Sequence, residues 1–311
     1  MNDIIGVDIG GTKCALSVPV GDGRVEEVAR FATTDVRATL ERIYAEIAKL
    51  APTRDAVFGV SCGGPLDAKR GLILSPPNLP GWDRIAICME LTQRFGGRAF
   101  LMNDANACAL AEWQFGAGRG CQSMMFLTMG TGMGAGLILD GRLYEGVTGN
   151  AGEVGHLRMA PDGPVGYGKT GSFEGFCSGG GIAQLARERV RTWAGQSQLQ
   201  TLPREEITAR AVGLAAEAGD ALALAIWRDV GTRLGEALAW FIDLLNPERI
   251  VIGSIYARCE KFLVPAMNEV IVREALPDSA RDCRVVPAEL GDEIGSYAAV
   301  AIARYHGART S

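Results

Sequence analysis

The stretch Ile4–Lys13, IIGVDIGGTK, indicates how this chain folds. Its apolar, β-branched start predicts a buried strand that stops at the adjacent glycines Gly10 and Gly11. The chain resumes as a predicted strand over Cys14–Val20, turns at a Gly-Asp-Gly sequence and continues as a third strand over Arg24–Ala32. We therefore expect three short strands joined by two tight turns at the start of the protein.

A second region with the same layout begins at Met124. A predicted strand breaks at Gly130–Gly134, resumes at Gly136–Leu139 and turns again. The sequences GDGRV at 21–25 and LDGRL at 139–143 occupy matching places, although the spacers differ in length. This similarity favours a weak internal duplication that gives two lobes. A chance likeness between two hairpins is the alternative.

Helical and strand patterns alternate through the rest of the chain. Strands are predicted at 56–61, 99–102, 249–252 and 284–287, whereas three prolines predict an irregular loop over Leu72–Trp82. Helices are predicted from Val36 to Leu50 and at 105–115, 180–193, 262–274 and 296–305, and most of 204–245 is also helical. Strands interleaved with helices in both halves indicate an α/β protein.

The composition is that of an ordinary globular protein. The 311 residues are 48% hydrophobic and 22% charged, with a net charge of −5, which disfavours binding to nucleic acid. No run reaches the roughly 18 apolar residues of a membrane span, and the N-terminus lacks the basic start of a signal peptide. The eight cysteines are scattered, without CxxC or a cysteine–histidine cluster. We expect reduced thiols and a cytoplasmic protein without nucleic-acid or membrane partners.

Both glycine-rich turns are candidate phosphate sites. In Asp8–Lys13, glycine lets backbone N–H groups approach a phosphate, while Thr12 and Lys13 add a hydroxyl and a cation. Asp8 is a candidate for holding Mg²⁺ through water, because this ion prefers oxygen ligands. The second turn is Thr128–Gly136, TMGTGMGAG. One such turn is more often a plain hairpin, but two at matching places favour the binding of a polyphosphate from both sides.

Asn103-Asp104 lies at the end of a predicted strand and just before a helix. The helix N-terminus would keep Asp104 ionised, and an ionised carboxylate can accept a hydroxyl proton. The alternative is that Asp104 only caps the helix, which this residue alone favours. Phosphoryl transfer needs positioning, charge neutralisation and a base. Together with the two turns, Asp104 therefore favours an ATP-dependent kinase that acts on an alcohol.

The stretch Gly146–Glu174 holds Glu153, His156 and Glu174 among many glycines. Glycines at 152 and 155 disfavour a regular helix around the acid–histidine pair, since glycine costs about 1 kcal/mol relative to alanine in a helix interior. Taken alone, the stretch slightly favours a surface loop with solvated charges. Within a kinase it would form the wall of a pocket for a polyhydroxyl substrate.

Six motifs together resemble the ROK family (repressor, open reading frame, kinase) of bacterial sugar kinases. They occur in the family's order at Asp8–Lys13, Pro76–Leu79, Asn103–Asn106, Thr128–Gly136, Gly152–His156 and Gly168–Glu174. The resemblance implies the two-lobed actin-like ATPase (ribonuclease H-like) fold, with the sugar in the interlobe cleft. We expect residues 1–117 and about 296–311 to form the small lobe, and 118–295 the large lobe. A homodimer is implied by the resemblance alone.

The resemblance also implies roles for individual residues, with Asp104 as the general base. Residues expected to bind the sugar are Gly64, Asn78, Asn103, Asp104, Glu153, His156 and Glu174. Residues expected to bind the nucleotide are Asp8, Gly10, Gly11, Thr12, Lys13, Gly130, Thr131, Gly132, Gly134, Gly253 and Ser254. Residues 246–254 resemble the segment that lies against adenosine, with Ser254 where a second glycine is usual.

The sequence departs from the family at its zinc motif. Where the family commonly has C-x-C-G-x-x-G-C-x-E, Val165, Tyr167 and Ser172 replace the three cysteines. Because zinc strongly favours thiolates and imidazoles, we predict that the protein binds no zinc. A hydrogen bond from Tyr167 or Ser172 would then have to orient His156.

These observations predict an ATP- and Mg²⁺-dependent hexokinase that phosphorylates the 6-hydroxyl of an aldohexose, with glucose as the first candidate. N-acetylglucosamine, N-acetylmannosamine and fructose are alternative substrates, because sequence does not measure the space beside Glu153 and His156. A sugar-responsive repressor is the alternative of another class, but the first strand at Ile4 leaves no room for a preceding DNA-binding domain. A catalytically inactive sugar-binding module is disfavoured by Asp104 and the two turns.

Overall fold

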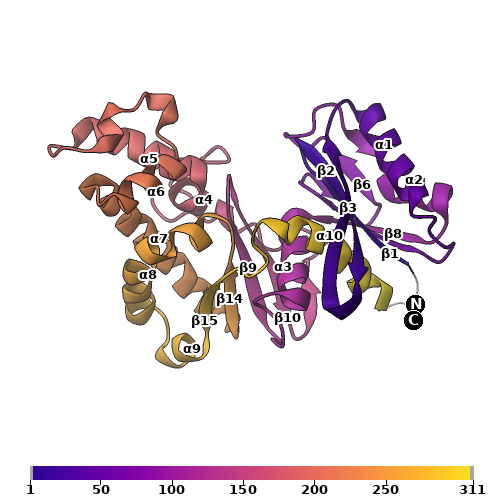
Figure 1. Cartoon of the computed structure of the whole chain (residues 1–311). Coiled ribbons are helices and arrows are strands. Elements are labelled where there is room, and N and C mark those ends of the chain that lie inside the picture. The colour runs from indigo at the N-terminus through magenta and orange to yellow at the C-terminus, as the bar shows by residue number, and fades with distance from the viewer. Residues whose placement is uncertain (1–2, 309–311) are drawn as a thin grey trace. The chain divides into compact units, whose positions relative to one another are not determined.

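The computed structural model describes residues 3–308, and the chain divides into two units (Figure 1). The first unit comprises the chain up to Gly120, the segment Gly136–Ala151 and the chain from Glu289 onward. The second comprises Cys121–Ala135 and Gly152–Ala288. The lobes expected from the sequence differ from this division at 136–151 and 289–295, and their boundaries stay a prediction.

The first unit is built on a five-stranded mixed sheet in the order β3-β2-β1-β4-β8. β1 (Ile4–Ile9), β2 (Lys13–Val20) and β3 (Arg24–Ala32) pair antiparallel in sequence order. β4 (Val57–Cys62) runs parallel to β1, and β8 (Arg98–Asn103) runs parallel to β4. The predicted strand–turn–strand–turn–strand unit is confirmed.

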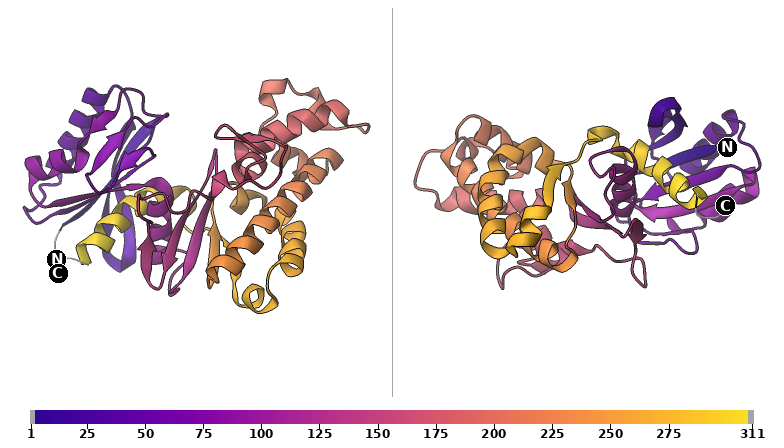
Figure 2. Two further views of the ribbon diagram at one scale, coloured as in Figure 1. Left: turned by 180° about the vertical axis from the view of Figure 1, so that it is seen from behind. Right: turned by 90° about the horizontal axis from the view of Figure 1, so that it is seen from below.

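Helices cover both faces of this sheet. Apolar residues of α1 (Val36–Lys49) and α2 (Ile87–Phe95) share one buried core with alternate residues of the strands. On the opposite face, α10 (Ile294–Ala308, yellow in Figure 2) contacts β1 and β4 as well as α3 (Asp104–Phe115). Glycine at position 59 permits this close approach, because a Cβ there would lie 2.1 Å from the carbonyl oxygen of Ala299.

A buried carboxylate ties two distant parts of the first unit to α3. Glu112 is fully buried, and its Oε2 accepts hydrogen bonds from the N–H groups of Ala117 (2.8 Å) and Glu289 (3.2 Å). Its Oε1 accepts a third from Leu290 (3.0 Å). These partners lie next to the points at which the chain leaves the unit after Gly120 and returns at Glu289. The bonds satisfy a charge that would otherwise be costly to bury.

A small antiparallel sheet corrects the prediction of an irregular loop over Leu72–Trp82. β6 (Leu72–Leu74) pairs with β5 (Leu66–Asp67) and with β7 (Asp83–Ile85). The prolines at 76, 77 and 80 confine the irregular part to the residues that follow β6. Proline lacks the N–H group that a strand donates, and its presence hid the short strand just before it.

The second five-stranded sheet repeats the strand order of the first. Its order is β11-β10-β9-β14-β15. β9 (Met124–Met129), β14 (Arg249–Ile252) and β15 (Arg284–Pro287) are parallel neighbours. β10 (Met133–Leu139) pairs antiparallel with β11 (Arg142–Tyr144), and the chain passes from the second unit to the first within β10. The common order supports the internal duplication that the sequence indicated.

The second unit also contains a layer of packed helices. The predicted apolar stripe from Ile226 to Ile242 is buried in α7, which packs against α8. α8 begins at Ile255, earlier than the predicted start at Phe262, because charged residues in its first turns mask the helical pattern. The helices are α4 (Phe173–Cys177), α5 (Gly179–Thr192), α6 (Ala209–Glu217), α7 (Ala221–Leu245), α8 (Ile255–Glu274) and α9 (Pro277–Asp282).

The remaining regular segments are short. Single 3-10 turns cover Gly21–Gly23, Val154–His156, Gln198–Thr201, Arg204–Glu206 and Gly291–Glu293, and a two-stranded hairpin is formed by β12 (Val165–Gly166) and β13 (Lys169–Thr170). Among residues 3–308, no helix is long and apolar enough to cross a membrane.

Candidate active site

The parallel strands of the first unit end together at one edge of the sheet. Ile9, at the end of β1, is paired with Cys62 of β4, which is paired with Asn103 of β8. Ligands of open α/β sheets bind beyond the carboxyl ends of such strands. The predicted residues Asp8, Asn103 and Asp104 therefore lie around one edge of the sheet.

The first glycine turn brings Asn78 to this edge. The turn is closed by the N–H of Gly10, which donates to the carbonyl oxygen of Lys13 at 3.0 Å. A Cβ on Gly11 would lie 2.3 Å from the carbonyl oxygen of Asn78, so only glycine fits there. The side-chain amide of Asn78 lies near Gly63, next to the exposed Gly64. The structure thus brings together three separate stretches of the sequence, which are the first glycine turn, Asn78 and Gly63-Gly64.

Asp8 occupies a site where an unneutralised negative charge is unfavourable. Burial, and to a lesser extent the charge of Asp104, raise the pKa of its carboxyl, whereas Lys13 and Arg30 lower it, and the net pKa is about 6. The hydroxyl of Ser61 donates a hydrogen bond to the carboxylate. Two neighbouring carboxylates are stabilised by a cation, and oxygen ligands suit Mg²⁺. Asp8 therefore fits that ion.

Asp104 is the first residue of α3 and does not cap it. The N-cap is Asn103, whose Oδ1 accepts a hydrogen bond from the N–H of Asn106 at 2.8 Å. Asp104 Oδ1 accepts one from Ala105 at 2.9 Å. Although the side chain is exposed, the surrounding protein displaces part of its water, which raises the pKa of its carboxyl. This loss of water outweighs the backbone N–H groups in its effect on the pKa, and the expectation that the helix N-terminus keeps Asp104 ionised stays a prediction.

In the second unit, the second glycine turn contacts the beginning of a helix. The N–H of Gly130 donates to the carbonyl oxygen of Gly132, and the N–H of Gly179 donates to that of Gly130 at 2.8 Å. Gly179 is the first residue of α5, which is capped by the hydroxyl of Ser178. A helix N-terminus attracts anions through its free N–H groups and its dipole. The turn and the helix end together are suited to phosphate.

A pocket of about 800 Å³ opens beside this turn, within the second unit. It is lined by the predicted residues Gly130, Thr131 and Ser254, together with residues of α5, α6 and α8. Sequence reasoning missed the contribution of α6, which carries no motif, and of Arg258 on α8. The lining residues from the end of the preceding loop through α6 are Thr208, Ala209, Arg210, Gly213, Leu214 and Glu217.

Ser254 adopts a backbone conformation that favours glycine. Its φ is +63°, and it precedes α8 without capping the helix through its side chain. A side chain in this region is strained, which gives a physical reason for the glycine expected at this position. Gly253, just before it, lies close to the ring of Phe126.

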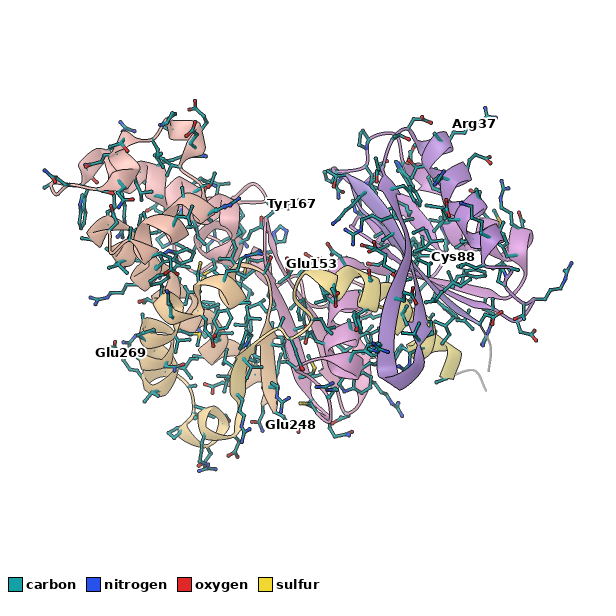
Figure 3. All side chains as sticks on the ribbon, viewed as in Figure 1. Arg37, Cys88, Glu153, Tyr167, Glu248 and Glu269 are labelled. Carbon is teal, nitrogen blue, oxygen red and sulfur yellow. The ribbon has the colours of Figure 1, made fainter. Side chains whose placement is uncertain are left out.

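The Glu153–His156 loop rests on the second glycine turn. The N–H of Ala135 donates to the carbonyl oxygen of Gly152 at 2.8 Å, and a Cβ on Gly155 would lie 2.4 Å from that of Met133. Glu174 Oε2 accepts a hydrogen bond from the N–H of Met133 at 3.0 Å. The side chains of Glu153 (Figure 3) and His156 are exposed, and the residues between them form a 3-10 turn in place of a regular helix.

The three positions that replace the zinc cysteines have separate roles. Val165 belongs to β12, and the buried Ser172 caps α4 by accepting a hydrogen bond from Gly175 N–H at 3.1 Å. Ser172 therefore does not orient His156, whereas the ring of Tyr167 meets the His156 ring edge-on at 5.1 Å. Within residues 3–308, no group of three or more His, Cys, Asp or Glu side chains is placed to hold a metal ion. These residues do not fit zinc, and its absence stays a prediction.

Comparison with known proteins identifies the family. A sequence model of the ROK family matches residues 4–306. The chain belongs to the ROK family. A glucokinase from Thermotoga maritima is 32% identical over 306 residues, which are 96% of each protein. The DNA-binding transcriptional dual regulator NagC of Escherichia coli is 34% identical over 220 residues, which are 70% of this chain and 53% of the regulator.

Solved structures agree with this assignment. The ROK family glucokinase from Streptomyces griseus, in complex with glucose and AMPPNP, has a TM-score of 0.75 at 28% identity. The match covers 97% of this chain and 99% of that one. The predicted ROK membership and the α/β, two-lobed actin-like ATPase fold are confirmed. The roles of individual residues in this ROK protein stay proposals.

Proposed function

We propose that this ROK protein transfers the γ-phosphoryl group of ATP to the 6-hydroxyl of an aldohexose, with glucose as the first candidate. The observation that carries the proposal is the environment of Asp104, an exposed carboxylate with a raised pKa at the start of α3. Its charge also acts on the carboxylate of Asp8. The similarity to a glucokinase along almost the whole chain supports the same reaction.

Asp104 is the proposed general base. Its raised pKa brings a carboxylate closer to the operating pH, which favours proton transfer in the transition state. The sugar hydroxyl gives its proton to Asp104 while its oxygen bonds to the γ-phosphorus. The bond from that phosphorus to the oxygen bridging the β- and γ-phosphates breaks, and ADP leaves with the electron pair. Asn78 and Asn103 of the first unit would orient the sugar.

The second unit supplies the proposed nucleotide site. The pocket of about 800 Å³ is large enough for an adenosine group, and its glycine turn and the N-terminus of α5 suit the phosphates. Arg210 and Arg258 add positive charge to its lining. When bound, Mg²⁺ neutralises phosphate charge, and Asp8 would hold it. Gly10, Gly11, Thr12 and Lys13 are also proposed to contact the phosphates.

Glu153, His156 and Glu174 are proposed to bind sugar hydroxyls. Carboxylates and imidazoles accept hydrogen bonds from hydroxyl groups and so select a polyhydroxyl substrate. One hydroxyl can change discrimination greatly when the site is built to bind it. N-acetylglucosamine, N-acetylmannosamine and fructose are therefore tested beside glucose.

A sugar-responsive regulator without kinase activity is the second candidate, because NagC matches 70% of this chain. A coupled assay of ADP release, run with hexoses, amino sugars and N-acetyl sugars, separates the two candidates. The kinase proposal predicts sugar-dependent turnover with at least one aldohexose. The absence of turnover with every sugar, together with salt-dependent binding of DNA, would favour the regulator instead.

A further inference from the structure

The segment between His156 and Glu174 is fixed by side chains that bond to its backbone. Lys169 Nζ donates to the carbonyl oxygen of His156 itself at 2.5 Å. Arg158 Nη1 donates to the carbonyl oxygen of Thr170 at 2.8 Å. Two long basic side chains thus join the part of the segment that follows His156 to the part that precedes Glu174.

A third side chain holds the hairpin of this segment against α5. The amide of Gln184 accepts a hydrogen bond from the N–H of Val165 at 3.0 Å and donates one to the carbonyl oxygen of the same residue at 2.8 Å. Both backbone groups of a strand residue are satisfied by one amide, as in pairing with another strand. The hairpin is therefore tied to a 14-residue helix rather than free in solvent.

The hairpin in turn packs closely against the backbone and Cβ of Glu174. A Cβ on Gly166 would lie 2.7 Å from Glu174 Cβ and 2.5 Å from the N–H nitrogen of Gly175. Backbone bonds complete the segment, since Phe173 N–H donates to the carbonyl oxygen of Leu157 at 2.8 Å. A shift of the hairpin would consequently move Glu174 as well as His156.

Tyr167 stands at the tip of the hairpin, against the imidazole of His156. Its side chain is 74% exposed, and its φ of +43° is unfavourable for a bulky residue. Its ring nevertheless contacts the His156 ring edge-on, with an angle of 87° between the planes (Tyr167 is labelled in Figure 3). This contact restricts the rotation of the imidazole ring.

We propose that a polar clamp, formed by Arg158, Lys169 and Gln184, positions His156 and Glu174 in this chain without a metal ion. The clamp holds the backbone of the histidine, and Tyr167 orients its ring. A metal ion would instead bind an imidazole nitrogen, so the clamp leaves both nitrogens available to a ligand. The role of these residues in sugar binding rests on the proposed function, whereas the order of the segment does not.

Hydrogen exchange tests the clamp independently of activity. In Lys169→Met, peptides that cover residues 157–173 are expected to exchange faster than in the wild type, while the rest of the second unit is unchanged. Lys169→Arg, which keeps a cationic donor, is expected to restore slow exchange. Lys49→Met is the matched control, because Lys49 also donates hydrogen bonds, but on α1 of the first unit. Gln184→Leu removes the two hydrogen bonds to Val165 and is also expected to speed exchange in residues 157–173.

Kinetics then distinguish positioning from general stability. Loss of the charged hydrogen bond is expected to raise KM for the sugar about tenfold, while KM for ATP and kcat change little. Removal of metals with a zinc chelator is expected to leave exchange in 157–173 unchanged. Unchanged exchange in both Lys169→Met and Gln184→Leu, or loosening by the chelator alone, would overturn the clamp. If no sugar is phosphorylated, the proposed function fails, but the exchange result still decides the clamp.

Discussion

The two five-stranded sheets share one strand order, yet the turns that follow their first strands are surrounded by different chemistry. In the first sheet, Asp8 lies two residues before Gly10, and the turn is backed by Asn78. In the second, the matching residue before Gly130 is Thr128, and the turn is backed by Gly179 at the start of α5. The first turn thus follows a carboxylate of its own strand, whereas the second follows a threonine and opens on a pocket of about 800 Å³.

This difference indicates how a repeated scaffold divides the work of phosphoryl transfer. Under the proposed function, the acids of the first copy would serve the reacting hydroxyl and the cation, whereas the pocket, the N–H donors and the two arginines of the second would serve the nucleotide. The residue after the last parallel strand shows the same division, since β8 leads into Asp104 and β15 leads into Ala288. The division is a property of side chains, because the strand order is common to both copies.

The largest loss of activity is expected when the proposed base in the first copy is removed. Asp104→Asn is expected to lower kcat about 1,000-fold or more, because the amide accepts no proton from the sugar hydroxyl. Sugar affinity, measured by calorimetry, should be largely kept. Asp35→Asn is the matched control, because Asp35 caps α1 in the same unit and asparagine caps a helix equally well. Equal kcat in the two variants would show that Asp104 is not the general base.

Substitution of the residue two positions before each glycine turn compares the two copies directly. Asp8→Asn is expected to lower kcat/KM for Mg-ATP about 100-fold, since the carboxylate proposed to hold Mg²⁺ is lost. Thr128→Val alters the equivalent position of the second copy and should have a far smaller effect. Steady-state kinetics at varied ATP and Mg²⁺ check both values. Equal losses in the two variants would contradict the division of the copies.

The raised pKa of Asp8 predicts an acid limb in the activity profile. Below about pH 6 its carboxylate gains a proton, so kcat/KM for Mg-ATP should fall about tenfold for each further pH unit. A raised folded-state pKa also means that Asp8 adds most to stability at low pH, a contribution lost as pH rises through about 6. The difference between wild-type and Asp8→Asn unfolding free energies across this range measures that contribution. A flat difference would argue against the burial of the charge.

The smallest effect is expected on stability, at the residues that follow the middle parallel strand of each sheet, β4 or β14. These are Gly63-Gly64 after β4 and Gly253-Ser254 after β14. Because Ser254 has a φ of +63°, Ser254→Gly is expected to stabilise the protein by about 1 kcal/mol. Urea unfolding of the variant and the wild type measures this gain. A loss of stability would show that the serine side chain makes a favourable contact that outweighs its strain.

Most strands and helices were predictable because their signals are local. An apolar run that ends at glycine predicted β1, turns with Asp-Gly predicted the starts of β3 and β11, and the apolar stripe of α7 is also local in sequence. The start of α8 was wrong because its first turns are charged, and β6 was missed beside prolines. In both cases the surrounding tertiary structure outweighs the local pattern.

The site was predictable only where a glycine or an acid had to be present. Gly11 is required by the carbonyl oxygen of Asn78, and such a requirement leaves a mark in the sequence. The residues of α6 that line the pocket leave no such mark in the sequence, because their place depends on how distant helices pack. Lys169 and Gln184 were also missed, because side chains that bond to a backbone carbonyl have no fixed spacing in the chain.

The carbon atom that receives the phosphate is the strongest test of the proposed reaction. The protein is incubated with ATP, Mg²⁺ and glucose labelled with carbon-13, and the product is identified by NMR through the coupling of phosphorus to carbon. Transfer to the 6-hydroxyl gives one product, with phosphorus coupled to C6 and ADP formed in equal amount. Coupling to C1, or the absence of any phosphorylated sugar, would contradict it.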